Sequence, residues 1–177
     1  MSNDPYYIYL DLDPYLAQWF VHDSGGTQPV ELRKLSTERR ILEVFLQKLP
    51  PGAKPDLKDD SKIEIVIPVS RTKPPKCYNY LPRRAKEELK RCIRSRFVIQ
   101  LWNDLHYHGY IGRRRDNLIY AWMDAHGIEL TETNWNTIAK IYIRQYKNYL
   151  QREQYKKKTK KYPKIVVDFP LLFWKSM

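Results

Sequence analysis

The sequence has little cysteine and lacks long apolar runs. Among its 177 residues only Cys77 and Cys92 are cysteines, too few for a disulfide scaffold and without the spacing of a metal site. No stretch approaches the ~20 apolar residues that span a bilayer. The acidic, tyrosine-rich start does not resemble a signal peptide. We therefore expect a cytoplasmic protein without a membrane partner.

Recognisable catalytic motifs are also missing. The sequence contains no Ser-His-Asp signature, nucleophile elbow, phosphate-binding Walker loop or dinucleotide glycine pattern. His106 and His108 stand two residues apart and would not share a helix face, while His22 and His126 are isolated in the sequence. This pattern favours a protein without a cofactor or metal and, more weakly, one that is not an enzyme.

Positive charge is concentrated in the second half of the chain. The net charge is +12; residues 1–70 have 8 basic and 11 acidic groups (net −3), whereas residues 71–164 have 23 basic and 8 acidic groups (net +15). Such a regional excess favours a polyanionic partner. The alternative is a solvated basic surface with no partner.

The first 70 residues predict a small sheet with one helix. Alternating apolar and polar residues, turn residues at Gly25 and Gly26, and an apolar stripe of helical spacing between Ser36 and Pro50 support this interpretation. The expected strands are 6–12, 15–21, 30–35 and 63–69. The sequence thus predicts an α+β fold that starts with a mostly antiparallel sheet and one helix.

The expected order, three strands, a helix and a strand, resembles the opening of the ribonuclease H-like fold. That resemblance implies metal-binding carboxylates on the first strand, at Asp11 or Asp13. Two-metal chemistry needs several carboxylates around cations about 4 Å apart, and nearby elements offer only Glu38, Glu43 and Glu64. A metal-dependent nuclease or transposase-like enzyme is therefore an alternative; otherwise the two aspartates only flank the turn at Pro14.

A basic, proline-containing segment, 71–81, is expected to link the sheet unit (1–70) to a basic helical unit (82–164). A helix of about 26 residues should begin at Pro82 and stop before Gly109. Leu89, Cys92, Ile93, Phe97, Leu101 and Leu105 would form its core stripe. Arg83, Lys90, Arg91 and Arg94 would form a basic edge able to follow a phosphate backbone.

The stretch 113–161 predicts a helix-turn-helix-like pair. Three arginines precede a helix capped by Asp116 or Asn117, which Gly127 would end, and Thr131 or Thr133 would cap a second helix. In the second helix Lys140, Arg144, Lys147 and Gln151 repeat on a face distinct from the apolar one. Such a pair is typical of proteins that read a DNA groove.

We therefore expect a non-catalytic DNA-binding regulator or accessory factor, with the helix at 133–151 in the groove and duplex DNA favoured over RNA. The expected contact residues are Arg83, Arg91, Arg113, Arg114, Arg115, Asn134, Asn136, Lys140, Arg144, Lys147, Lys156, Lys157 and Lys158. Alternatives are an RNA-binding module that stacks bases on exposed tyrosines, and an assembly component that binds an acidic protein. The apolar segment 165–174, within 165–177, would pack on the sheet, on a second copy or on a partner protein.

Overall fold

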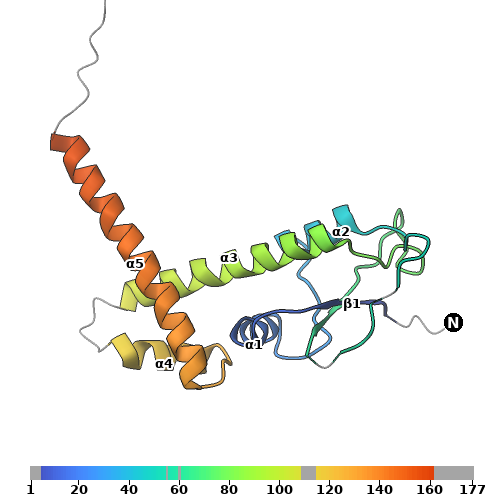
Figure 1. Ribbon diagram of the computed structural model, residues 1–177, viewed down its shortest axis with the longest axis horizontal. Helices are drawn as coiled ribbons and strands as arrows, with labels where there is room; N and C mark the ends of the chain where they lie inside the picture. Colours follow the sequence, from blue (N-terminus) through green and yellow to red (C-terminus); the bar gives the residue numbers. More distant parts are fainter. Residues whose placement is uncertain (1–4, 55, 60, 109–114, 162–177) are drawn as a thin grey trace, which may run out of the picture. The chain divides into compact units, whose positions relative to one another are not determined.

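The computed structural model describes residues 5–54, 56–59, 61–108 and 115–161, without the side chains of 107, 108, 115 and 158–161 (Figure 1). The fold is α+β and mostly helical. Its elements are β1 (Tyr7–Leu10), α1 (Pro14–Asp23), α2 (Thr37–Phe45), β2 (Ile63–Val66), α3 (Arg83–His108), α4 (Arg115–Ala125) and α5 (Glu132–Lys161). The chain forms two compact units, Met1–Tyr142 and Ile143–Met177. The segment 71–81, expected to be a linker, lies inside the first unit.

Two short antiparallel strands form the sheet. Tyr7 of β1 pairs with Val66 of β2, and Leu10 pairs with Ile63. Side chains alternate between buried and half-buried along both strands, as expected for strands with one face on a core. Val30 adds a single parallel bridge to Ile65, so the small antiparallel sheet predicted from the sequence is confirmed.

The strand predicted at 15–21 was wrong, because this stretch is the helix α1. Pro14 stands at the first helical position, where its missing N–H has no partner to lose. Tyr15, Leu16, Trp19 and Phe20 are all buried, and their spacing places them on one helix face. The strand at 30–35 reduces to the Val30 bridge, so the element order does not match the ribonuclease H-like opening.

The helix α2 begins as predicted. The Ser36 hydroxyl accepts a hydrogen bond from the Arg39 amide (3.2 Å), and Glu38 lies in the first turn, where its charge complements the positive end of the helix dipole. Leu42 is its fully buried apolar residue. The helix ends at Phe45, earlier than expected, and the Lys73 ammonium donates to the carbonyl oxygens of Glu43 and Val44 (both 2.8 Å).

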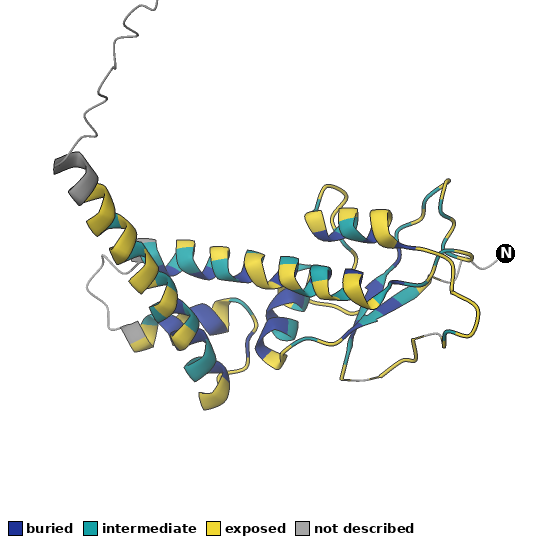
Figure 2. Cartoon of the chain, turned by 45° about the horizontal axis from the view of Figure 1, so that its top comes forward, coloured by how far each residue is buried: buried dark blue, intermediate teal, exposed yellow. Residues whose placement is uncertain are grey.

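The central element of the first unit is α3, which has the predicted length of 26 residues. Figures 1 and 2 show α1, α2 and α4 packed against it. Its buried residues recur every fourth position: Ala85, Leu89, Ile93, Phe97, Leu101 and Leu105. Each such step turns about 40° beyond a full circle, so the buried stripe winds by about 200°. Different stretches of one helix can therefore pack against different neighbours.

Phe97 of α3 contacts aromatic side chains of both α1 and α4. Its ring centroid lies 5.3 Å from those of Tyr15 and Trp19 in α1, and 5.5 Å from that of Trp122 in α4. All three pairs are edge-to-face, the arrangement that aromatic quadrupoles favour. The same core extends from Ile8 and Leu10 of β1 to Ile138 and Tyr142 of α5.

No described helix is long and apolar enough to cross a membrane.

The connection between α4 and α5 follows the sequence prediction. Gly127 has a φ of 65°, the left-handed conformation that glycine adopts after a helix. The Thr131 hydroxyl accepts a hydrogen bond from the Asn134 amide N–H (3.3 Å) and caps α5. However, α5 continues to Lys161, whereas we expected the lysines after Gln151 to extend beyond the helix. Lys, Gln, Arg and Glu are good helix formers, and no Gly or Pro interrupts them before Pro163.

Candidate nucleic-acid interface

The exposed face of α5 contains three basic side chains. Helical periodicity places Lys140, Arg144 and Lys147 within an arc of about 60° around the axis, and all three are exposed. Ile138 and Tyr142, on the opposite side, are buried. The apolar side of the first part of α5, up to Tyr142, therefore packs on the core of the first unit, while Lys140 points away from it. We call Lys140, Arg144 and Lys147 the α5 basic face.

No described carboxylate forms an ion pair with the α5 basic face. Between residues 143 and 161 the chain has eight Lys and Arg and one acidic residue, Glu153, which pairs with Lys156 (2.9 Å). These 19 residues form a helical stretch about 28 Å long. Residues 143–157, whose side chains are described, are mostly exposed (Figure 2), so their charges face solvent and attract anions.

Asn134 was predicted to lie in the groove, but the structure places it away from solvent. This residue is buried, and its side-chain amide donates to the carbonyl oxygen of Glu129 (3.0 Å), closing the turn before α5. Nearby, the Thr137 hydroxyl donates to the Thr133 carbonyl (2.9 Å), and Asn136 is half-buried. The first turns of α5 therefore offer few polar groups that could read bases.

Helix α3 pairs most of its basic residues with carboxylates of the same chain, and three of the four residues of the predicted basic edge (Lys90, Arg91 and Arg94) are among them. Its ion pairs are Lys86 with Asp56, Lys90 with Glu87 (3.4 Å), Arg91 with Glu88 (2.6 Å), Arg94 with Asp13 (3.7 Å) and Arg96 with Glu38 (3.3 Å) and Asp23 (3.2 Å). Of the two α3 residues predicted to bind nucleic acid, Arg91 is thus paired, whereas Arg83 is exposed without a described ion partner. We omit Arg91 from the interface proposed below.

Part of the predicted site lies outside the description. Arg113 and Arg114 are outside the described residues, and so are the side chains of Arg115 and Lys158. Lys157 is exposed. Lys156 donates to Glu153 Oε1 (2.9 Å), and this hydrogen bond to a carboxylate raises the pKa of Lys156 above its ordinary value. Lys156 therefore keeps its charge at neutral pH, though that charge is compensated within α5.

Basic side chains surround Asp11 and Asp13, the two carboxylates of the predicted alternative metal site. Both aspartates line an open hollow of about 530 Å³ that also contains Glu87, Lys90 and Arg94. Asp13 lies 3.7 Å from Arg94. In the described ranges, no three or more His, Cys, Asp or Glu side chains gather as metal ligands would.

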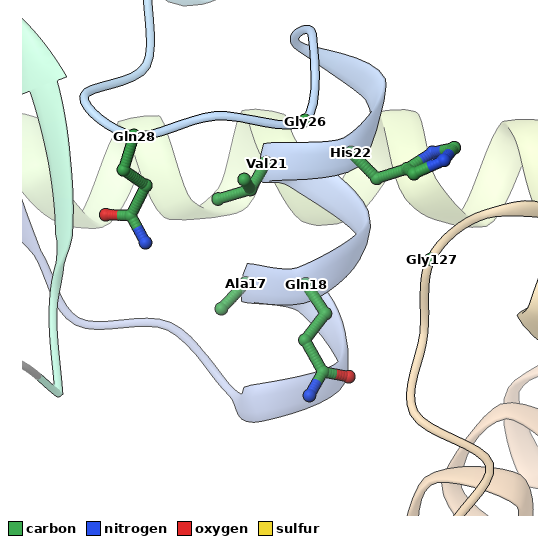
Figure 3. A pocket seen from close by; sticks show the side chains of 7 residues that line it. All are labelled: Ala17, Gln18, Val21, His22, Gly26, Gln28 and Gly127. Carbon is green, nitrogen blue, oxygen red and sulfur yellow. The ribbon is translucent and has the colours of Figure 1, made fainter.

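A second hollow, of about 330 Å³, lies beside the α4–α5 connection (Figure 3). Its amide side chains are already hydrogen-bonded. Gln18 accepts from the Glu129 amide N–H (3.0 Å), and Gln28 accepts from the amide N–H of Glu64 (3.1 Å). Gln18 thus links α1 to the connection that leads into α5, and Gln28 links the loop after α1 to β2.

His126, isolated in the sequence, is part of a polar cluster between α3 and α4. Its Nδ1 lies 2.8 Å from the carbonyl oxygen of Trp122, which can only accept, so this nitrogen is the donor. Nε2 lies 3.0 Å from Gln100 Nε2, and Trp122 Nε1 donates to Asp104 (2.9 Å). No local sequence signal identifies this cluster, because Gln100 and Asp104 come from α3, whereas Trp122 and His126 come from α4 and its C-terminal end.

The chain was compared with protein families, curated proteins and solved structures. No family model, curated protein or solved structure matches it.

Proposed function

We propose that the chain is a non-catalytic DNA-binding protein, a regulator or an accessory factor, that binds duplex DNA through the α5 basic face. The observation that carries this proposal is the contrast between two helices. Lys140, Arg144 and Lys147 are exposed and have no described acidic partner, whereas most basic residues of α3 have one. Unpaired cations are the groups that phosphates can engage without first breaking an ion pair.

The shape of α5 is compatible with this ligand. The major groove of duplex DNA is about 12 Å wide and admits an α-helix. A six-residue connection, 126–131, joins α4 to α5, and the rings of Tyr120 and Trp135 stack across the pair (5.8 Å). In the proposed complex α5 is the groove helix of a helix-turn-helix-like pair. Because Asn134 is buried, it cannot contact a base. In the proposed complex α5 therefore contacts mainly phosphates, which favours weak sequence preference.

The test is the salt dependence of binding to a random duplex. Each phosphate contact changes the slope of log K against log salt by about 0.9. Replacing Lys140, Arg144 and Lys147 by Gln should make the slope shallower by up to about 2.7 and weaken binding by as much as about 500-fold near 0.1 M salt. The readout is fluorescence anisotropy between about 50 and 200 mM salt.

A matched control is Lys90→Gln/Arg91→Gln, which removes two exposed or half-exposed cations that are paired with Glu87 and Glu88. Because that change also leaves two carboxylates unpaired, a small loss of affinity is acceptable. Single-stranded RNA serves as the competitor that separates DNA binding from base stacking on tyrosines. The proposal fails if the α5 variant, still folded by circular dichroism, binds duplex with the wild-type slope of log K against log salt.

A cytoplasmic location of the protein remains a prediction.

A further inference from the structure

A second basic segment lies in the first compact unit. Residues 71–84 include five Lys and Arg and no Asp or Glu. We expected a linker at 71–81, and the charged side chains of a flexible linker would have no fixed positions. The structure instead packs this segment into the first unit. Its charges therefore have defined positions.

Three contacts hold the segment on residues 43–48 at the end of α2. Gln47 and Tyr80 exchange both backbone hydrogen bonds (3.0 and 3.1 Å). The Lys48 ammonium lies 5.7 Å from the centroid of the Tyr78 ring, and the Lys73 ammonium caps the α2 carbonyls described above. Buried Leu81 anchors the end of the segment in the core. Such ordering reduces the conformational entropy that binding must remove.

Four of the five cations remain available. Arg71, Lys76, Arg83 and Arg84 are exposed, and within the part of the chain that the structure describes none forms an ion pair. Lys73 is occupied by the α2 carbonyls. We call these four residues the 71–84 surface.

We propose that the 71–84 surface is a second phosphate-binding surface for the same duplex DNA. The inference rests on the proposed function for its ligand. Both the α5 basic face and the 71–84 surface consist of exposed cations without a described acidic partner, and a polyphosphate fits such cations. Arg83 begins α3, and Trp102 lies about 28 Å further along that helix, with its ring 5.9 Å from that of Tyr142 in α5. The surface is therefore remote from the place where α5 joins the core.

This separation predicts additive contributions to binding, because distant sites rarely couple. The experiment uses the full-length chain and a random duplex of about 24 base pairs, much longer than 28 Å at 3.4 Å per base pair. It compares wild type, the variant with Arg71, Lys76, Arg83 and Arg84 changed to Gln, the α5 variant, and the combination of both. The surface variant should lower the salt slope by up to about 3.6, and the combination should lose the sum.

The outcomes separate the two proposals. A folded surface variant with wild-type affinity and slope overturns the second surface, and the proposed function then stands if the α5 variant is weakened. Wild-type slopes in both variants overturn both. A competition assay adds a further outcome. If polyglutamate displaces the bound duplex as readily as unlabelled duplex of equal charge does, the inference is overturned in favour of an acidic protein partner. If the fourfold variant does not fold, Arg83→Gln/Arg84→Gln alone should still lower the slope by about 1.8.

Discussion

Replacing Gly127 by alanine should destabilise the fold by two separable effects. Gly127 ends α4 with a φ of 65°, a conformation that costs an L-residue roughly 1–2 kcal/mol. An added Cβ would also lie 2.6 Å from Cδ2 and 3.0 Å from Cβ of His22 in α1. Because His22 Cβ is fixed by the α1 backbone, a ring rotation cannot relieve the whole clash.

The expected cost is the sum of strain and overpacking. Overpacking typically costs about 1–3 kcal/mol, so Gly127→Ala should lose about 2–5 kcal/mol of unfolding free energy in total. For a chain of this size that corresponds to a fall in Tm of roughly 4–20 °C. Urea unfolding, followed by circular dichroism and tryptophan fluorescence, gives the free energy directly.

A matched control isolates the contact with His22. Gly52 has a φ of 80°, and an added Cβ there meets nothing within 4 Å, so Gly52→Ala should show the backbone cost alone. His22→Ala, on an exposed side chain, should by itself change stability by about 0.5 kcal/mol or less. In combination with Gly127→Ala it should recover part of the clash. Equal losses for Gly127→Ala and Gly52→Ala, with no coupling to His22, would refute the close approach of α1 to the connection.

Two further predictions concern ionisable groups in α1, α3 and the 71–84 segment. Burial raises the pKa of the Cys92 thiol, whereas Cys77 is exposed, so a thiol reagent at neutral pH should modify Cys77 first; equal rates would contradict this. Burial also raises the pKa of the Tyr15 phenol above 10.0, with a smaller opposing effect of Arg94. The neutral phenol therefore stabilises the fold below pH 10, and this contribution is lost as pH rises through the higher folded pKa. Above pH 10 the unfolding free energy of Tyr15→Phe should fall less than that of wild type. If the unfolding free energies of the two proteins change in parallel with pH, ionisation of Tyr15 does not destabilise the fold.

The sequence predicted those elements whose signals are local. Both ends of α3 were predicted from Pro82 and Gly109, the start of α2 from the Ser36 cap, and the end of α4 from Gly127. Each signal acts within one helical turn. The helix α1 was missed because Tyr15–Val21 is rich in aromatic and β-branched residues that favour strands. Its packing against Phe97 overrides that preference.

The candidate site was predicted only in part, for the same reason. The amphipathic pattern of α5 identified the exposed positions of Lys140, Arg144 and Lys147. The pairing of α3 cations could not be read from the sequence where the partner is distant, as with Asp13 for Arg94 or Asp56 for Lys86. Whether an asparagine near a helix start faces solvent or closes a turn likewise depends on tertiary burial.

The most direct test of the α5 basic face is lysine footprinting with and without saturating duplex DNA. Acetylation of each lysine, measured by mass spectrometry, reports whether its ammonium is covered. We expect Lys140 and Lys147 to lose reactivity on binding, while Lys62, which pairs with Asp59 in the loop before β2, keeps its own. If Lys140 and Lys147 stay as reactive in the saturated complex as in the unbound chain, DNA does not lie on this face of α5, and the proposed interface is wrong.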